Sequence, residues 1–136
     1  MSTTRYLENQ VLSTDPIGLV VLLYEGAIGA VRQACGFLAE GRIAERSTAI
    51  NKAMQIVAEL QGSLDLERGE EVARGLAHLY SFVQERLIEA NASQKLPPLN
   101  EVLLILSTLQ EGWKDISLGP VEQKGTVEAG VMAWTL

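Results

Sequence analysis

Few side chains in this chain could carry out chemistry. Its only histidine is His78 and its only cysteine is Cys35. A di-metal carboxylate bundle needs a Glu-x-x-His pair from each of two helices, but residue 75, three positions before His78, is glycine. A catalytic pair of Cys35 and His78 would need a third group to orient the histidine, and no motif supplies one. With no phosphate-binding loop and no zinc-ligand spacing, the sequence predicts no metal site, no cofactor and no enzyme activity.

Glycines inside an apolar stretch are the next feature that could carry function. The stretch from Asp15 to Gly41 reads as one long helix, and within it Gly26, Gly29 and Gly36 share a face. Each glycine costs about 1 kcal/mol of helix propensity relative to alanine. The stripe therefore either packs tightly against a neighbouring helix or forms a groove that admits another polypeptide.

Composition and charge narrow the class of protein. The chain has 136 residues, 47% of them hydrophobic and 21% charged, as is typical of one soluble domain. Its net charge of -6 makes nucleic acid an unfavourable partner. The apolar run from Ile17 to Tyr24 is too short to span a bilayer, and no signal segment precedes it. These features predict a cytosolic protein that does not insert into membranes.

The remaining pattern predicts an all-α protein, an up-and-down antiparallel four-helix bundle over residues 1–118. Its long helices are expected at about 16–40, 43–66, 70–92 and 100–118. A turn is expected at Gly69, an extended connector at Pro97–Pro98 and a helix cap at Asn100. Leu7 and Val11 predict a short additional helix within residues 1–14.

The tail, residues 119–136, has no clear pattern. It contains Val131, Met132 and Trp134. Either it is a frayed terminus, or Trp134 docks back on the bundle.

The third helix and its neighbours hold more apolar residues than the inner seams require. We expect that helix to bury Val72, Leu76, Leu79, Tyr80, Val83, Leu87 and Ala90. Five further apolar residues are left over: Phe82, Leu103, Leu104, Met54 and Ile56. Such an excess favours an interaction surface, used either for self-association as a homodimer or for a helix-in-groove partner.

Several short motifs occur together in a recognisable order. They are Tyr6, Val11, Thr14–Pro16, Leu19, Leu22–Ile28, Lys52–Leu60, Ser63–Asp65, Gly69, Val72–Ala73, Leu79–Tyr80, Leu87, Glu89–Asn91, Glu101–Val102, Leu106, Leu109 and Trp113. In this order the chain resembles the flagellar export chaperone FliS family from residue 6 to about residue 116. It departs from the family pattern at Gly18, where an acid is usual, and in the tail beyond residue 118.

The resemblance implies a small cytosolic helical bundle that is not an enzyme and uses no cofactor. Such proteins bind the disordered C-terminal segment of newly made flagellin, prevent its premature polymerisation and present it to the flagellar export apparatus. It also implies that the N-terminal segment, here Tyr6 with Leu7 and Val11, can occupy part of the binding surface.

From the apolar pattern and the family resemblance together, we predict seven partner-binding residues: Tyr6, Leu7, Val11, Ile50, Met54, Val57 and Phe82. For Ile50 and Val57, a purely structural role in the core is an equal alternative, because both lie on a helix seam. A dimerisation or adaptor module of unrelated function is the alternative for the protein as a whole.

Overall fold

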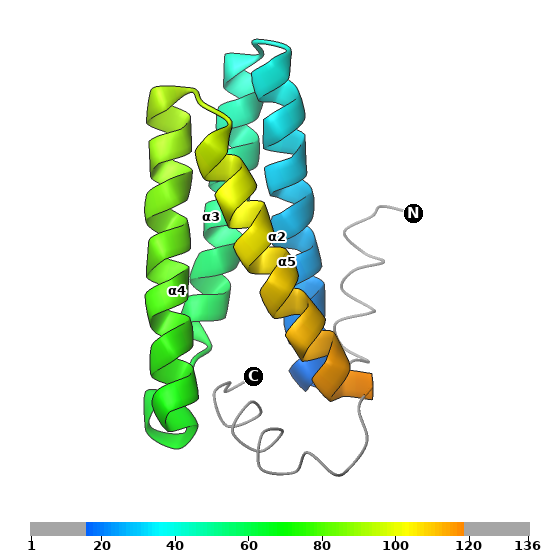
Figure 1. Cartoon of the computed structure of the whole chain (residues 1–136), viewed down its shortest axis with the longest axis vertical. Coiled ribbons are helices and arrows are strands. Elements are labelled where there is room, and N and C mark those ends of the chain that lie inside the picture. Colours follow the sequence, from blue (N-terminus) through cyan, green and yellow to red (C-terminus); the bar gives the residue numbers. More distant parts are fainter. Residues whose placement is uncertain (1–15, 119–136) are drawn as a thin grey trace.

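The structure is a computed structural model that describes residues 16–118. Four helices make up this part: α2 (Pro16–Ala39), α3 (Ile43–Gly62), α4 (Leu66–Ser93) and α5 (Pro97–Leu118). They pack against one another and are joined by short linkers at alternating ends of the molecule (Figure 1). This confirms the prediction of an all-α, four-helix protein. The short helix predicted within residues 1–14 and the tail, 119–136, lie outside the described residues.

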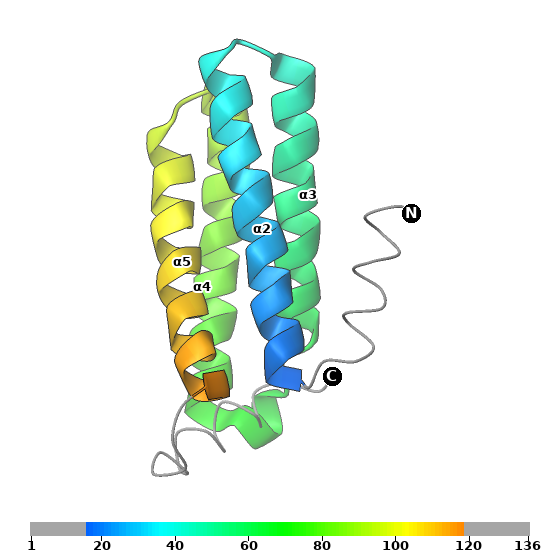
Figure 2. The ribbon, with the colours of Figure 1, turned by 90° about the vertical axis from the view of Figure 1, so that its right-hand side faces the viewer.

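The four helices form a closed ring around one core. α2 packs on α3 and α5, and α4 packs on the same two helices, as Figures 1 and 2 show from two sides. Apolar residues recur on the inner face of each helix at the spacing that a 3.6-residue turn requires. The largest fully buried side chains are Tyr24, Tyr80, Ile50, Leu60, Leu87, Leu99, Leu106, Val20, Val31, Val57, Val83 and Val102.

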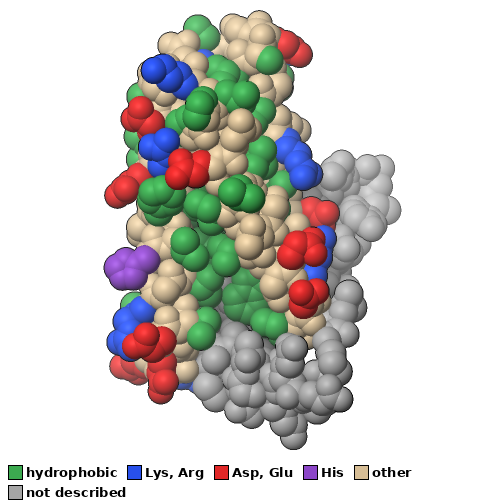
Figure 3. Space-filling view, in the orientation of Figure 1, with side chains coloured by type: hydrophobic (Ala, Val, Ile, Leu, Met, Phe, Trp, Pro, Cys, Tyr) green, Lys and Arg blue, Asp and Glu red, His purple; other side chains and the backbone are tan. Residues whose placement is uncertain are grey.

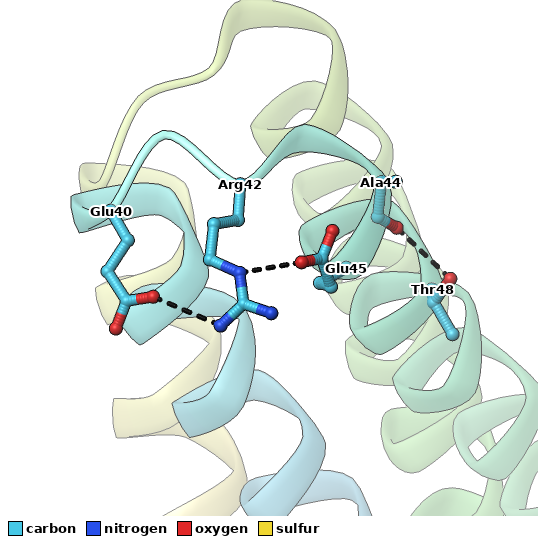
Figure 4. A network of polar contacts seen from close by, with 5 residues as sticks. All are labelled: Glu40, Arg42, Ala44, Glu45 and Thr48. Carbon is cyan, nitrogen blue, oxygen red and sulfur yellow. Dashed lines mark hydrogen bonds and ion pairs between the residues drawn. The ribbon is translucent and has the colours of Figure 1, made fainter.

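The turn between α2 and α3 is built by glycine and arginine. Gly41 has a φ of +70°, which glycine adopts without steric cost, and the Arg42 backbone N–H donates to the Phe37 carbonyl at 2.9 Å. The Arg42 side chain bonds to Glu45 at 2.6 Å and Glu40 at 3.3 Å (Figure 4). Through this contact Arg42 lowers the pKa of the Glu45 carboxyl. α2 ends at Ala39, two residues before Gly41 and one before the predicted end at residue 40.

The boundary between α3 and α4 differs from the prediction. α3 ends at Gly62 and α4 begins at Leu66, capped by Asp65, whose carboxylate accepts from the Arg68 backbone N–H at 3.0 Å. Gly69 is buried inside α4 and is not a turn between helices. The break in regular backbone falls one residue later, at Glu70, where φ is 48° and the helix is kinked.

The start of α5 was also predicted too late. Pro97 and Pro98 do not form an extended connector but occupy the first turn of α5, where a missing backbone N–H costs nothing. Asn100 is therefore inside the helix, and its backbone N–H donates to the Leu96 carbonyl at 3.1 Å.

α2 is long and apolar enough to cross a membrane if judged only by length and composition. Its most apolar run, Ile17 to Tyr24, is by itself too short to span a bilayer. In the bundle, however, the inner face of α2 supplies Val20, Tyr24, Ala27 and Val31 to the core. We therefore interpret it as a core helix.

Candidate functional site

The predicted partner-binding residues do not form a single surface. Ile50 and Val57 have 0% exposure and lie in the core, so a partner cannot reach them in this conformation. Met54 is half-buried, and its carbonyl accepts from the Gln84 side chain of α4 at 2.9 Å. Phe82 is 39% exposed and is the clearest surface residue of the set. The other three, Tyr6, Leu7 and Val11, lie outside the described residues.

An open groove of about 810 Å³ lies between α2 and α3. Its lining residues are Leu23, Gln55, Ile56, Ala58, Glu59, Gly62 and Ser63. Gly26 lies beside it, and a Cβ added there would stand 3.2 Å from Cδ1 of Ile56. Since Leu23 is near the start of α2 and Gly62 ends α3, the groove opens at the end of the bundle where the described chain begins.

The glycine stripe only partly explains this groove. Gly26 approaches α3 closely, as tight packing requires. A Cβ at Gly29 or Gly36 would meet no heavy atom within 4 Å in the part of the chain that the structure describes. Tight helix packing therefore accounts for one of the three glycines.

A second apolar surface runs along one side of α4. Val72, Leu79 and Phe82 are 40%, 37% and 39% exposed, and their spacing places them on the same side of the helix. Gly75 lies between them, and no atom of the described chain comes within 4 Å of the place where its Cβ would be. We name these four residues the α4 apolar face.

The α4 apolar face is turned toward α5. Arg86, one helical turn after Phe82, donates through Nε to Oε2 of Glu101 on α5 at 2.9 Å. Beyond this contact α5 crosses toward the start of α2, so α4 and α5 diverge (Figure 1). Hydrophobic side chains gather between them on the side shown in Figure 3.

The side of α5 that continues from Glu101 is also apolar. It carries Ile105, Leu109 and Ile116, which are partly buried against the core. Gly112 lies among them and, like Gly75, has open space in place of a side chain within the described residues. The two diverging helices thus leave a shallow apolar surface with room on both sides.

Ionisable groups form no reactive centre in residues 16–118. No three His, Cys, Asp or Glu side chains come together there as a metal site. The buried hydroxyls of Tyr24 and Tyr80 share a hydrogen bond of 2.5 Å, and burial raises the pKa of Tyr24 to about 12. Burial also raises the pKa of the Cys35 thiol, which makes it less reactive. What the described surface offers is apolar binding area.

The sequence analysis missed Val72 and Leu79 as surface residues. It placed both on the inner seam of the third helix, but α4 buries the other five predicted residues together with Ala73 and leaves Val72 and Leu79 at the surface. At 100° per residue, Val72 lies about 50° and Leu79 about 70° from the centre of that seam. Both residues lie at the edge of the seam, so the spacing pattern alone does not separate them from its buried residues.

Comparison with known proteins identifies what this bundle is. A family model described as flagellar protein FliS matches residues 1–119. The flagellar secretion chaperone FliS of Salmonella typhimurium is 36% identical over 112 residues, which cover 82% of this chain and 83% of that protein. The flagellar secretion chaperone FliSB of Pseudomonas aeruginosa is 38% identical over 111 residues, covering 82% of this chain and 88% of that protein. A third relative, the flagellar secretion chaperone FliS of Bacillus subtilis, is 26% identical over 111 residues, which cover 82% of this chain and 82% of that protein.

Chaperones of this kind are not enzymes. The match over nearly the whole chain and the identity to these relatives show that the chain belongs to the FliS family of flagellar proteins.

Proposed function

We propose that this chain is a cytoplasmic export chaperone for flagellin. It binds the disordered C-terminal segment of flagellin, prevents premature polymerisation and presents the segment to the flagellar export apparatus. Membership of the FliS family and the names of its relatives as flagellar secretion chaperones support this. The observation that carries it is the apolar surface left open on a complete bundle, in the α2/α3 groove and along the α4 apolar face.

Two separate apolar surfaces suit a disordered client better than a folded one. In the ring of helices, the α2/α3 groove and the α4/α5 side lie on opposite sides of the bundle. A flexible segment can cover both by wrapping around the bundle, and each covered Å² contributes about 25 cal/mol. The cost of ordering the segment offsets part of this gain, which keeps the complex reversible.

The N-terminal segment is the proposed lid of the α2/α3 groove. Residue 15 precedes Pro16 at the end of the bundle where the groove opens, so the segment needs no long crossing to reach it. We propose that it forms a short helix that lays Leu7 and Val11 with Tyr6 over Leu23 and Ile56. Tyr6→Ala should then change client affinity with little loss of thermal stability, because a short marginal helix contributes little to the core. A large fall in melting temperature would make Tyr6 structural instead.

The direct test is calorimetric titration of the full chain with a peptide of the flagellin C-terminus from the same organism. We expect a one-to-one complex with a Kd in the micromolar range or below, and no heat with a scrambled peptide of the same composition. The absence of binding at micromolar concentrations would overturn the proposal.

One observation favours a second candidate, a helical dimerisation module. Leu104 on α5 is 70% exposed, the largest value among the exposed large hydrophobic residues of the described chain. Self-association through this residue predicts a dimer whose fraction rises with concentration in light scattering and falls in Leu104→Lys. A monomer at all accessible concentrations would remove this candidate.

A further inference from the structure

The α4 apolar face is too small to hold a second copy of the chain. Val72, Leu79 and Phe82 each leave about two-fifths of their surface exposed, which together is on the order of 200 Å² of apolar area. A stable interface between two proteins buries about 800 Å² on each partner. A small face of this kind suits an occupant that is already tethered, because a tether supplies an effective concentration in the millimolar range.

The chain carries such a tethered segment. The family match ends at residue 119, so all of the tail after its first residue lies beyond the match. The tail's apolar residues are concentrated near the C-terminus, at Val131, Met132, Trp134 and Leu136. The preceding stretch is polar or small apart from Val121 and Val127 and includes Gly125. This is the composition of a spacer followed by a short apolar anchor.

The tail begins at the right place and is long enough. α5 ends at Leu118, at the same end of the bundle as the first half of α4 (Figure 1). Val131 comes 13 positions after Leu118, and an extended chain of that length spans about 40 Å. Phe82 lies 16 residues after Leu66, or about 24 Å along α4. The anchor can therefore reach every residue of the α4 apolar face.

We propose that the tail docks its Val131–Trp134 anchor on the α4 apolar face of its own chain. The open positions at Gly75 and Gly112 leave room on both sides for a bulky indole, and the exposed side chains of Leu79 and Phe82 supply its apolar walls. The tail then shields this face and competes with the client for it. The competition, unlike the docking, rests on the proposed function.

The docking is tested in the full chain by NMR of its two tryptophan indole N–H groups, Trp113 and Trp134. Trp134→Phe assigns the signals, and a soluble gadolinium chelate broadens exposed N–H groups. We expect the Trp134 signal to be protected in the parent chain. In Gly75→Glu it should broaden several-fold more, since the new side chain fills the face. That variant should fold, because its Cβ enters open space and glutamate is the better helix former.

Gly36→Glu is the matched control, since Gly36 is an exposed α2 glycine with no atom of the described chain within 4 Å of an added Cβ. It should leave Trp134 protected. Equal broadening of Trp134 in the parent chain and in Gly75→Glu would overturn the docking. So would protection that grows with protein concentration, which would mean binding to a second copy.

Competition is tested separately by titrating the flagellin peptide into Trp134→Ala. We expect binding several-fold tighter than to the parent chain. An unchanged Kd would overturn the competition while leaving the docking intact. A peptide that binds neither protein would instead overturn the proposed function, and the NMR result would still stand.

Discussion

Replacing Phe82 by alanine tests most directly whether the α4 apolar face binds the client. Phe82 is 39% exposed. A fully covered phenylalanine buries about 200 Å², so about 80 Å² of Phe82 is left for a client to cover. At about 25 cal/mol per Å² this area contributes about 2 kcal/mol. Phe82→Ala should therefore weaken binding of the flagellin peptide by about 30-fold in Kd when the tail does not compete, and by less when it does.

The assay is the calorimetric titration described above, with Ile88→Ala as the matched control. Ile88 lies on the same helix and is 56% exposed, but it is more than 100° around the helix from Phe82. If affinity depended only on general surface hydrophobicity, Ile88→Ala would weaken binding at least as much. We expect it to change the Kd less than threefold. Urea unfolding of both variants ensures that affinities are compared between fully folded proteins.

Equal binding of the peptide by the two variants, whether both are weakened or neither is, would rule out a client site on the α4 apolar face. A loss confined to Ile88→Ala would place the client on the other side of α4. Repeating the pair in the Trp134→Ala background separates loss of client contacts from loss of tail docking, because the tail no longer competes there.

Three further predictions concern the bundle itself. Burial raises the pKa of Tyr24 from 10.0 to about 12 and shifts that of Tyr80 in the same direction, so the folded protein keeps protons that the unfolded chain releases above pH 10. The unfolding free energy should thus hold steady below pH 10 and fall between pH 10 and 12, by about 3 kcal/mol through Tyr24 and by a further amount through Tyr80. Urea titrations of Tyr24→Phe should show a smaller loss over this range. Asp65→Ala should cost about 1 kcal/mol of unfolding free energy by removing the cap of α4. Arg46 is 4% exposed, its Nε has no hydrogen-bond partner among residues 16–118, and its other hydrogen bonds are 3.4–3.5 Å long. Arg46→Met should therefore change stability by less than about 1 kcal/mol in urea unfolding, and a loss above 3 kcal/mol would contradict this account.

The helical fold could be read from the sequence because its signals are local. Apolar residues at three- and four-residue spacing identify each helix, and Gly41 marks a turn that glycine alone adopts easily. The boundaries at Leu66 and Pro97 were misplaced for a local reason too. Gly69 and Pro97–Pro98 were read as breaks, yet a glycine can be buried inside a helix and a proline is favoured in its first turn.

The binding surface was harder to predict because it depends on how the helices are rotated against one another. Val57 and Phe82 are both large and apolar, and only the packing shows that one is in the core and the other on the surface. The glycines posed the same difficulty. Gly26 meets a neighbouring helix and Gly36 does not, although the two occupy similar sequence contexts.

The open face of α4 follows from where the polar contacts hold α5. Near its start, α5 is tied to α4 by the ion pair of Glu101 with Arg86. Further along, its contacts turn to α2, where Gln110 donates to the Val21 carbonyl at 3.5 Å and Trp113 hydrogen-bonds Tyr24. Two ends held by different helices force α5 to cross the bundle diagonally, and the first half of α4 is left uncovered on that side. Because the core closes without this face, an occupant can bind and leave it while the four helices stay packed.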